Sequence, residues 1–274
     1  MRKLLLLLIG GIVCVLLVTG CKETGHSNNR YVNKWIGTAS DGRVTPVASV
    51  PFGMMQIGAD TRSCGSGYHY DDSSVLGFSH LHKSGGGCAD FLDILFMPLP
   101  LNEAVDGDRL YSKQYQAALS HQEEKAEPGY YSVNLYNKQL TVELTASRRC
   151  GIQRYRYTSG GVIPVVVDLN YGSECACTIQ PEHDVDTVYI SAFELVDSCT
   201  IRGYRFSNGW TPGQQVYFYS RFSSPIKTCA LYVDDRRIAE TSFAEGRNIK
   251  ALLSFENECG ELTVKTALSS VSME

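Results

Sequence analysis

The chain has 274 residues, and its 25 basic and 29 acidic side chains give a formal charge of −4. This balance argues against a nucleic-acid-binding protein, which needs a basic surface, and it is compatible with neutral ligands such as sugars. The length is sufficient for one large domain or two small ones, and we favour one.

The N-terminus carries an export signal. Arg2 and Lys3 precede an apolar run from Leu4 to Val18, and Val-Thr-Gly leads into Cys21. This order is typical of a signal peptide, and the run is shorter than the roughly 20 residues of a membrane-spanning helix. The residues before Cys21 resemble a bacterial lipobox.

We therefore predict a lipoprotein signal peptide at residues 1–20 and lipidation of Cys21, the first residue of the mature protein. The alternative is an uncleaved membrane anchor, and both interpretations export the chain. The predicted location is the periplasm or the cell surface, with attachment to a membrane. Residues 21–30 are polar and lack periodicity, which is typical of a tether.

Histidines and aspartates concentrate between Ser66 and Pro98, among glycines and aromatic residues. They are His69, His80, His82, Asp71, Asp72, Asp90 and Asp93. If His80 and His82 lie on one strand, both imidazoles share a face. Metal ligation, a structural hydrogen-bond network and a ligand-contacting wall are then the three interpretations. Because transition-metal sites need three or more protein ligands, we favour the last two.

The aspartates of this segment do not suit a catalytic acid–base pair. Asp90 and Asp93 would point to opposite faces of one extended strand, because their offset is odd. Asp71 and Asp72 are adjacent and are typical of solvated turn carboxylates or caps. We therefore assign no catalytic acid or base.

A glycine-rich loop, Ser84 to Gly87, follows these histidines. It is suited to present backbone amides to a ligand, with Gly85 at its centre, or to lie against a partner domain. A plain flexible connection is the alternative. It is not a phosphate-binding loop, because the Lys-Ser/Thr pair and the helix of that motif are missing.

Further along the chain the dominant period is two. Tyr131–Leu135, Leu140–Ala146 and Leu262–Lys265 alternate apolar and polar residues, which predicts half-buried antiparallel strands. Val162–Val167 and Val216–Phe218 are continuously apolar and predict strands covered on both faces. With frequent turn residues and no long amphipathic helix, the chain is predicted to be an all-β antiparallel sandwich of many short strands.

The cysteines are less informative. Eight remain after Cys14 in the signal peptide and Cys21 are set aside, and no disulfide pairing can be assigned. Cys175 and Cys177 lack a second pair at the spacing of a zinc site.

The segment from Ser66 to Pro98 resembles the N-terminal domain of glycoside hydrolase family 92, the inverting exo-acting α-mannosidases of gut bacteria. The resemblance extends in order from about Tyr31 to the final residue. Its further motifs are Ile36-Gly37-Thr38, Val50-Pro51-Phe52-Gly53-Met54, Asp60-Thr61, Glu127-Pro128-Gly129-Tyr130-Tyr131, Arg154-Tyr155 and Tyr217-Phe218-Tyr219-Ser220-Arg221.

The resemblance implies a large supersandwich of the galactose-mutarotase-like type at residues 31–274. In the family, an α/α-barrel follows and carries the catalytic carboxylates and most calcium ligands, and nothing resembling it is present. No metal or cofactor is therefore expected in this chain, although calcium is implied for the complete enzyme. Inverting hydrolysis needs carboxyl groups roughly 6.5–9.5 Å apart, and we expect the barrel to supply them.

The sandwich is implied to form one wall of a pocket for a mannose-containing glycan, such as an N-glycan. The implied substrate-binding residues are Phe52, Gly53, Asp60, Tyr68, His80, His82, Ser84, Gly85 and Asp90. Two positions depart from the family pattern. Arg62–Gly65 replaces a Trp-x-Trp-Cys run, which leaves the linkage specificity open, and Gln153 replaces a common histidine.

Two functions follow as alternatives. The first is the substrate-binding domain of an α-mannosidase that is inactive without a barrel in trans; the second is a stand-alone surface glycan-binding lipoprotein, or a non-functional fragment. Under the first, the surface carrying His80, His82, Ser84 and Gly85–Gly87 is expected to meet the barrel.

Overall fold

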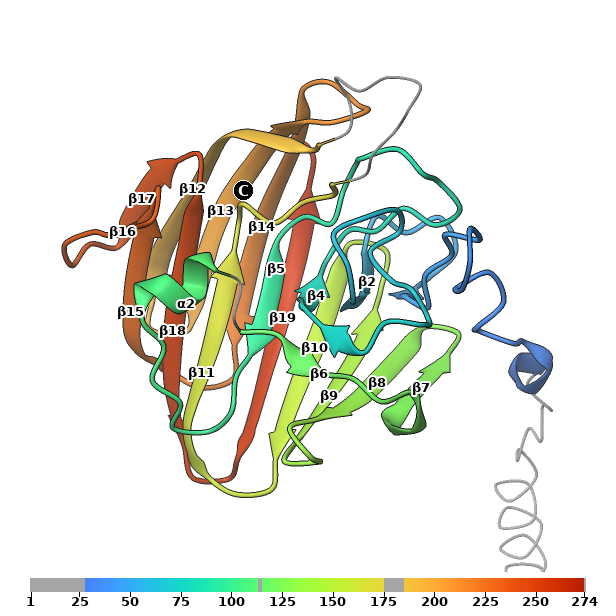
Figure 1. Ribbon diagram of the computed structural model, residues 1–274. Helices are drawn as coiled ribbons and strands as arrows, with labels where there is room; N and C mark the ends of the chain where they lie inside the picture. The colour runs from blue at the N-terminus through green and yellow to red at the C-terminus, as the bar shows by residue number, and fades with distance from the viewer. Residues whose placement is uncertain (1–27, 113–114, 175–184, 274) are drawn as a thin grey trace, which may run out of the picture. The chain divides into compact units, whose positions relative to one another are not determined.

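The computed structural model describes residues 28–112, 115–174 and 185–273 (Figure 1). Residues Asn33–Glu274 form one compact unit. In the unit that precedes it, Asn28–Tyr31 is a short 3-10 helix, η1, so the end of the predicted tether is not featureless. The predicted signal peptide and Cys21 lie outside the described residues.

Two large antiparallel sheets make up most of the compact unit. The first has eight strands in the order β1 (Ala48–Ser49), β2 (Gln56–Asp60), β4 (Gly77–Ser79), β5 (Leu95–Pro98), β11 (Gly161–Asp168), β18 (Ile249–Asn257), β15 (Ile226–Val233) and β16 (Arg236–Arg237). The second has nine in the order β17 (Phe243–Gly246), β12 (Thr187–Asp197), β13 (Thr200–Asn208), β14 (Gln214–Phe222), β19 (Glu261–Ser269), β10 (Cys150–Tyr157), β9 (Leu140–Ala146), β8 (Tyr130–Leu135) and β7 (Glu124–Glu127).

The remaining elements are short. They are a two-stranded sheet of β3 (Ser74–Val75) and β6 (Ala117–Ala118), the helix α2 (Gly107–Tyr111) and the 3-10 helix η2 (His121–Glu123).

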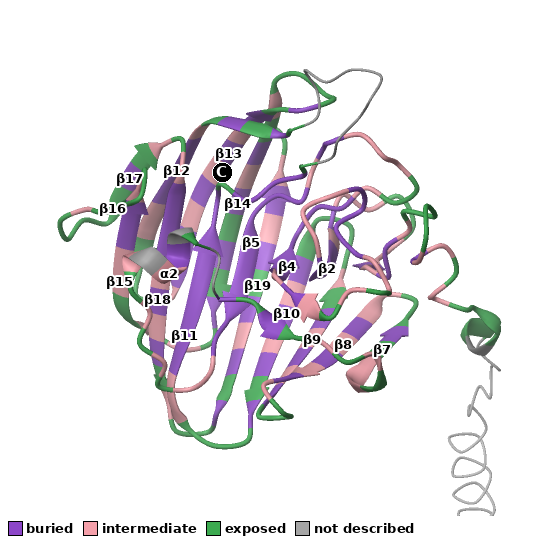
Figure 2. Cartoon of the chain, viewed as in Figure 1, coloured by how far each residue is buried: buried purple, intermediate pink, exposed green. Residues whose placement is uncertain are grey.

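The period-two segments are strands, as predicted. β8 and β9 alternate buried and partly exposed residues along almost their whole length, and β19 does the same (Figure 2). Since alternate side chains of a strand point to opposite faces, each of these strands has one face in the core and one toward solvent.

The continuous apolar runs had two outcomes. β11 is buried from Ile163 to Asp168, so both of its faces are covered, as predicted. Val216–Phe218 was predicted to be covered on both faces and is not: Val216 and Phe218 are buried, whereas Tyr217 between them is half-exposed. The run is continuously apolar because β14 carries an aromatic residue, Tyr217, on its solvent face.

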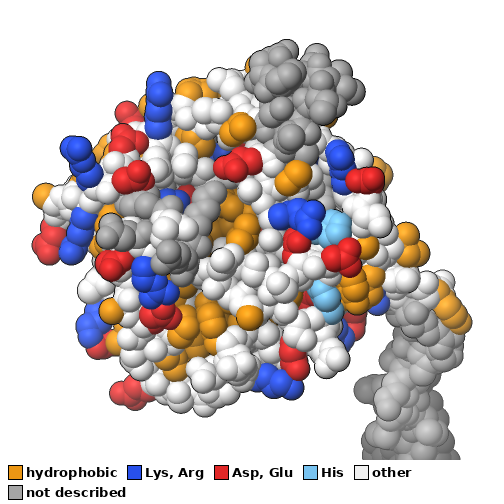
Figure 3. All heavy atoms as spheres, in the orientation of Figure 1, with side chains coloured by type: hydrophobic (Ala, Val, Ile, Leu, Met, Phe, Trp, Pro, Cys, Tyr) orange, Lys and Arg blue, Asp and Glu red, His pale blue; other side chains and the backbone are white. Residues whose placement is uncertain are grey.

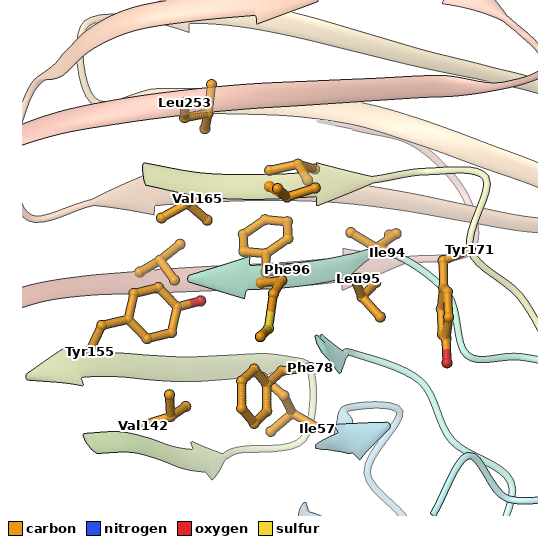
Figure 4. Close-up of a cluster of buried hydrophobic side chains, with 14 of the residues drawn as sticks. Ile57, Phe78, Ile94, Leu95, Phe96, Val142, Tyr155, Val165, Tyr171 and Leu253 are labelled. Carbon is orange, nitrogen blue, oxygen red and sulfur yellow. The ribbon is translucent and has the colours of Figure 1, made fainter. Parts of the chain in front are cut away.

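The core lies between the two sheets. Phe78, Phe96 and Val165 of the eight-stranded sheet lie close to Val142 and Tyr155 of the nine-stranded sheet (Figure 4). Aromatic rings also bridge the layers, with Phe96 stacked on Phe222 at a centroid distance of 6.4 Å. The predicted all-β antiparallel sandwich is therefore confirmed.

Candidate functional site

A strained turn precedes β2 and displays an aromatic ring. The Gly53 amide donates to the Val50 carbonyl oxygen at 3.0 Å, which closes the turn over Pro51 and Phe52. Phe52 has a φ of 59° and its side chain is fully exposed. Glycine or asparagine normally fills this position, and an ordinary residue there costs about 1 kcal/mol or more. The chain therefore holds a phenyl ring in solvent at the expense of backbone strain.

Contacts behind the turn fix its position. The amides of Met54 and Met55 both donate to the Arg148 carbonyl oxygen, at 2.7 and 3.2 Å. A Cβ atom on Gly53 would lie 3.0 Å from Val50 Cγ2 and 3.3 Å from Arg148 Cα. Glycine thus allows the turn to pack tightly against the β9–β10 hairpin.

The turn borders an open groove of about 800 Å³, which we call the Phe52 groove. Its lining residues are Thr45, Val47, Ser49, Val50, Pro51, Phe52, Gly53, Gln56, Ser84, Pro128 and Gly129. The groove brings together three of the predicted site residues, Phe52, Gly53 and Ser84. The other six, Asp60, Tyr68, His80, His82, Gly85 and Asp90, are not among the residues that line it.

His82 lies behind the groove and not on its wall. Its Nδ1 is 2.8 Å from the carbonyl oxygen of Gln56, a groove residue, and its Nε2 is 3.2 Å from Asp60 Oδ1. The other oxygen of Asp60 accepts from the Ser79 amide at 2.8 Å. Both the imidazole and the carboxylate are fully buried. This pair therefore supports β2 from behind.

His80 belongs to a second buried chain of hydrogen bonds. Tyr155 donates its hydroxyl to Gln153 Oε1 at 2.8 Å, and Gln153 Nε2 lies 3.1 Å from His80 Nε2. Since that amide nitrogen is a donor, His80 Nε2 accepts, and Nδ1 donates to the Ile94 carbonyl oxygen at 2.6 Å. Burial lowers the pKa of His80 to about 4, so the imidazole is neutral.

The expectation that these histidines lie on a partner-facing surface is therefore wrong. His80 and His82 follow β4, so they do not share a strand, and they are 0% and 2% exposed. They form no part of a partner-facing surface in this domain, whereas Ser84 and Gly85 in the same predicted surface are exposed. The polar atoms of each imidazole already have partners inside the fold, which is the usual reason for burying such a group.

Tyr68 is also buried, with an exposed fraction of 2%. Its hydroxyl donates to Glu124 Oε2 at 3.1 Å, and the same carboxylate lies 2.5 Å from the Tyr131 hydroxyl and from His121 Nδ1. Burial and the adjacent Glu124 raise the pKa of Tyr68. The Tyr68 side chain anchors its segment to the start of β7.

The turn aspartates have unequal surroundings. Asp71 is solvent-exposed, as predicted. Asp72 instead accepts from Thr61 Oγ1 at 2.7 Å and from Arg62 Nη2 at 2.5 Å. Burial alone would raise the pKa of Asp72, but these hydrogen bonds outweigh it and leave the pKa below its usual value.

Asp93 is part of a buried ion cluster that the sequence did not reveal. Arg205 of β13 is fully buried and binds Asp93 through Nη1 and Asp186 through Nη2, the latter at 2.7 Å. Gln214 Nε2 also donates to Asp93, at 2.8 Å. Burial, opposed by Arg205, raises the pKa of Asp93 to about 7. The sequence signal for this cluster was the position of Arg205, which lies two residues before Ser207 and alternates with the outward residues of β13.

Asp90 lies in the same loop and is 4% exposed. Its Oδ2 accepts from Thr211 Oγ1 at 2.7 Å, and burial raises its pKa. Asp90 and Asp93 therefore bind the β13–β14 hairpin, and neither lines the Phe52 groove.

Gly85 sits at an exposed bend with a φ of 81°, and its amide donates to the Arg43 carbonyl oxygen at 2.6 Å. Charged side chains of both signs are scattered over the face seen in Figure 3. Within the described ranges, no group of three or more His, Cys, Asp or Glu is placed to hold a metal ion. No helix in this part of the chain is long and apolar enough to cross a membrane.

The structure is similar to those of known mannosidases. It matches the family GH92 α-mannosidase BT3965 of Bacteroides thetaiotaomicron with 32% identity and a TM-score of 0.78, over 89% of this chain and 33% of that one. The inverting mannosidase BT2199 of the same species matches with 26% identity and a TM-score of 0.70, over 89% of this chain and 31% of that one. This chain thus spans about a third of their length.

A protein of Arthroderma benhamiae described as an uncharacterized secreted glycosidase is 30% identical over 173 residues, which is 60% of this chain and 22% of that protein. The model of the glycosyl hydrolase family 92 N-terminal domain matches residues 31–269. The match covers both sheets, the strained Phe52 turn and the buried polar segment behind it. The chain therefore belongs to glycosyl hydrolase family 92 and contains its N-terminal domain.

Proposed function

We propose that the Phe52 groove binds a mannose-containing glycan and forms one wall of an α-mannosidase site. The observation that carries this proposal is Phe52 itself, a fully exposed ring held at a φ of 59° beside an open groove. Strained residues persist where a function requires them. An aromatic ring offers an apolar face to the C–H side of a sugar, while the hydroxyl of exposed Ser84 offers a hydrogen bond.

The relatives support the substrate class. One structure of the mannosidase BT3965 holds mannoimidazole. The Arthroderma benhamiae relative is described as secreted, which supports export of this chain. Lipidation of Cys21 remains a proposal from the sequence: a fatty-acid analogue should label the wild type and leave Cys21→Ser unlabelled.

We also propose that this domain does not hydrolyse α-mannosides alone and that hydrolysis needs an α/α-barrel domain. The groove is lined by hydroxyl, amide and apolar side chains, and none of its lining residues is Asp or Glu. It therefore offers neither an acid–base pair nor the carboxylate-rich oxygen shell that calcium prefers. Calcium does not fit the residues of this groove, and the purified chain should not hydrolyse an aryl α-mannoside, with or without added calcium.

Calorimetric titration with methyl α-mannoside tests the binding role. The wild type should bind saturably, and Phe52→Ala should weaken binding by about tenfold, the loss expected from one stacked ring. Val271→Ala, which shortens another exposed apolar side chain outside the groove, is the control and should bind like the wild type. Equal affinity of all three proteins would refute the proposal.

A further inference from the structure

The solvent face of the nine-stranded sheet is divided into two chemically different halves. Over β9 and β10 it carries charged side chains, with Arg154 and Arg156 both paired to Glu143. Over β12, β13, β14 and β17 it carries aromatic side chains. We call this half the aromatic face, and its residues are Tyr189, Tyr204, Phe206, Tyr217, Tyr219 and Phe243.

Strand parity places these rings outside the core. Along β13 the inward residues are buried, including Arg205 and Ser207, whereas Tyr204 and Phe206 are half-exposed. β14 repeats the pattern, and Tyr219 is 40% exposed. Tyr204 and Tyr217 are directly paired across the two strands. Tyr204, Phe206 and Tyr217 therefore form one continuous surface over neighbouring strands. Tyr219 and Phe243 lie on the same face of the sheet, opposite Arg202 and Glu194.

The rings at the centre of the aromatic face contact one another. Tyr204 stacks on Phe206 with a centroid distance of 4.6 Å, and Phe206 meets the edge of Tyr217 at 5.2 Å. Tyr189 extends the cluster, 6.2 Å from Phe206. Such cross-strand aromatic pairs stabilise a sheet, which is a sufficient explanation for the three central rings.

Sheet stabilisation does not explain the exposed rings at the edge of the aromatic face. Tyr189 is 38%, Tyr219 40% and Phe243 50% exposed, so these side chains leave much of their apolar surface in water. They surround the packed centre on both sides, on β12, β14 and β17. Clustered exposed aromatic residues on a soluble domain mark a binding surface.

The charges beside the rings indicate what binds. Arg202 Nε donates to Glu194 Oε2 at 2.6 Å, and the Tyr204 hydroxyl donates to Glu245. Exposed Arg221 and Lys265 are paired across β14 and β19, and exposed Asp197 interacts with Arg221. The flanking groups thus include three acids and three bases, so no net field favours an ionic ligand.

Protein interfaces are also rich in Tyr, Phe and Arg, but they keep charged pairs at the rim, whereas here the pair of Glu194 and Arg202 lies between Phe243 and Tyr219 across the sheet. Rings interleaved with balanced polar groups instead suit a neutral polyhydroxylated chain.

We propose that the aromatic face is a second carbohydrate-binding surface, which takes an extended neutral glycan chain such as α-mannan. The sugar rings would stack on the marginal aromatic side chains, while Arg202, Glu194 and Glu245 hydrogen-bond to hydroxyls. This proposal does not depend on the Phe52 groove, because the groove is bordered by the β7–β8 turn, at the opposite end of the same sheet.

Affinity electrophoresis in native gels containing soluble α-mannan tests the proposal. All proteins carry Phe52→Ala, so that the groove contributes little. We expect α-mannan to retard this background protein, and the added pair Tyr189→Ala and Tyr219→Ala to weaken retention by about tenfold or more. Tyr189→Phe with Tyr219→Phe should retain most binding, because the rings remain. Arg156→Ala on the charged half of the sheet is the control and should change nothing.

The proposal would be overturned if α-mannan did not retard the background protein, or if the alanine pair left its retention unchanged. In the second case sedimentation shows what the face does instead. If the wild type self-associates and the alanine pair is monomeric, the face is an interface between copies. In protein that keeps Phe52, the part of methyl α-mannoside binding that Phe52→Ala removes reports on the groove, so failure of one site is distinguishable from failure of the other.

Discussion

The Phe52 groove and the buried histidines and aspartates of the Ser66–Pro98 segment show how little residue type alone says about a site. Residue type alone would select the histidines and aspartates of this segment as site residues, yet His80, His82, Asp90 and Asp93 are all buried. The groove has no ionisable lining residue but displays Phe52 in solvent. Burial separates the two regions: His80, His82 and Asp93 hydrogen-bond to other parts of the fold, whereas Phe52 lies in solvent.

The largest expected effect lies in the buried part. At pH 8, where the raised pKa of Asp93 still leaves its carboxyl ionised, Arg205→Met would leave Asp93 and Asp186 buried without their cation. This should cost about 3–5 kcal/mol of unfolding free energy in urea. Arg202→Met on the same strand removes a partly exposed pair with Glu194 and should cost about 1 kcal/mol or less. Similar losses for the two variants would show that the Arg205 cluster is not a structural centre.

The pH dependence of stability also tests whether the Arg205 cluster is a structural centre. The pKa of Asp93 is raised to about 7, so the folded state holds its proton at pH values where the unfolded chain has released it. Its contribution is complete below the unfolded pKa of about 4 and is lost as pH rises through about 7. The stability advantage of wild type over Asp93→Asn should therefore decrease from pH 4 to pH 7.

His80 acts in the opposite direction, because its pKa is lowered to about 4 and acid favours the unfolded chain. Since both proteins in that comparison contain His80, its contribution cancels. An advantage of the wild type that grows with pH would contradict the burial of a proton at Asp93.

A loss of comparable size is expected in the hydrogen-bond chain through Gln153. Gln153→Leu removes the partner of both His80 Nε2 and the Tyr155 hydroxyl, which are buried. Leaving such groups unsatisfied costs about 1–3 kcal/mol each, measured by thermal or urea unfolding. Tyr155→Phe, which removes only the last donor of the chain, should be milder, and the reverse order would show that His80 does not need Gln153.

The smallest expected effect has the opposite sign. Phe52→Gly relieves a positive φ and removes no buried contact, so stability should stay unchanged or rise by about 0.5–1 kcal/mol, while methyl α-mannoside binding falls. Phe52→Ala keeps the strain and should lose binding without gaining stability. A clear loss of stability in Phe52→Gly would mean that the ring serves packing.

The sequence predicted the sandwich because alternation along β8, β9 and β19 is a local property of the chain. It also indicated Phe52, Gly53 and Ser84, whose motifs resemble the family. It could not show that His80 and His82 are buried, because their partners Gln153 and Gln56 come from other strands. The Arg205 cluster joins residues more than a hundred positions apart, and only the inward parity of Arg205 hinted at it.

The central claim is that Phe52, and not the buried histidines, contacts the sugar. The most direct test follows individual side chains while methyl α-mannoside is added. In protein labelled on phenylalanine rings and histidine imidazoles, with Phe52→Ala used to assign the ring, NMR reports which groups sense the sugar. The account predicts saturable shifts of the Phe52 ring signals, with His80 and His82 signals unchanged because both imidazoles are enclosed by the fold. Shifts at the imidazoles with a silent Phe52 ring would contradict it.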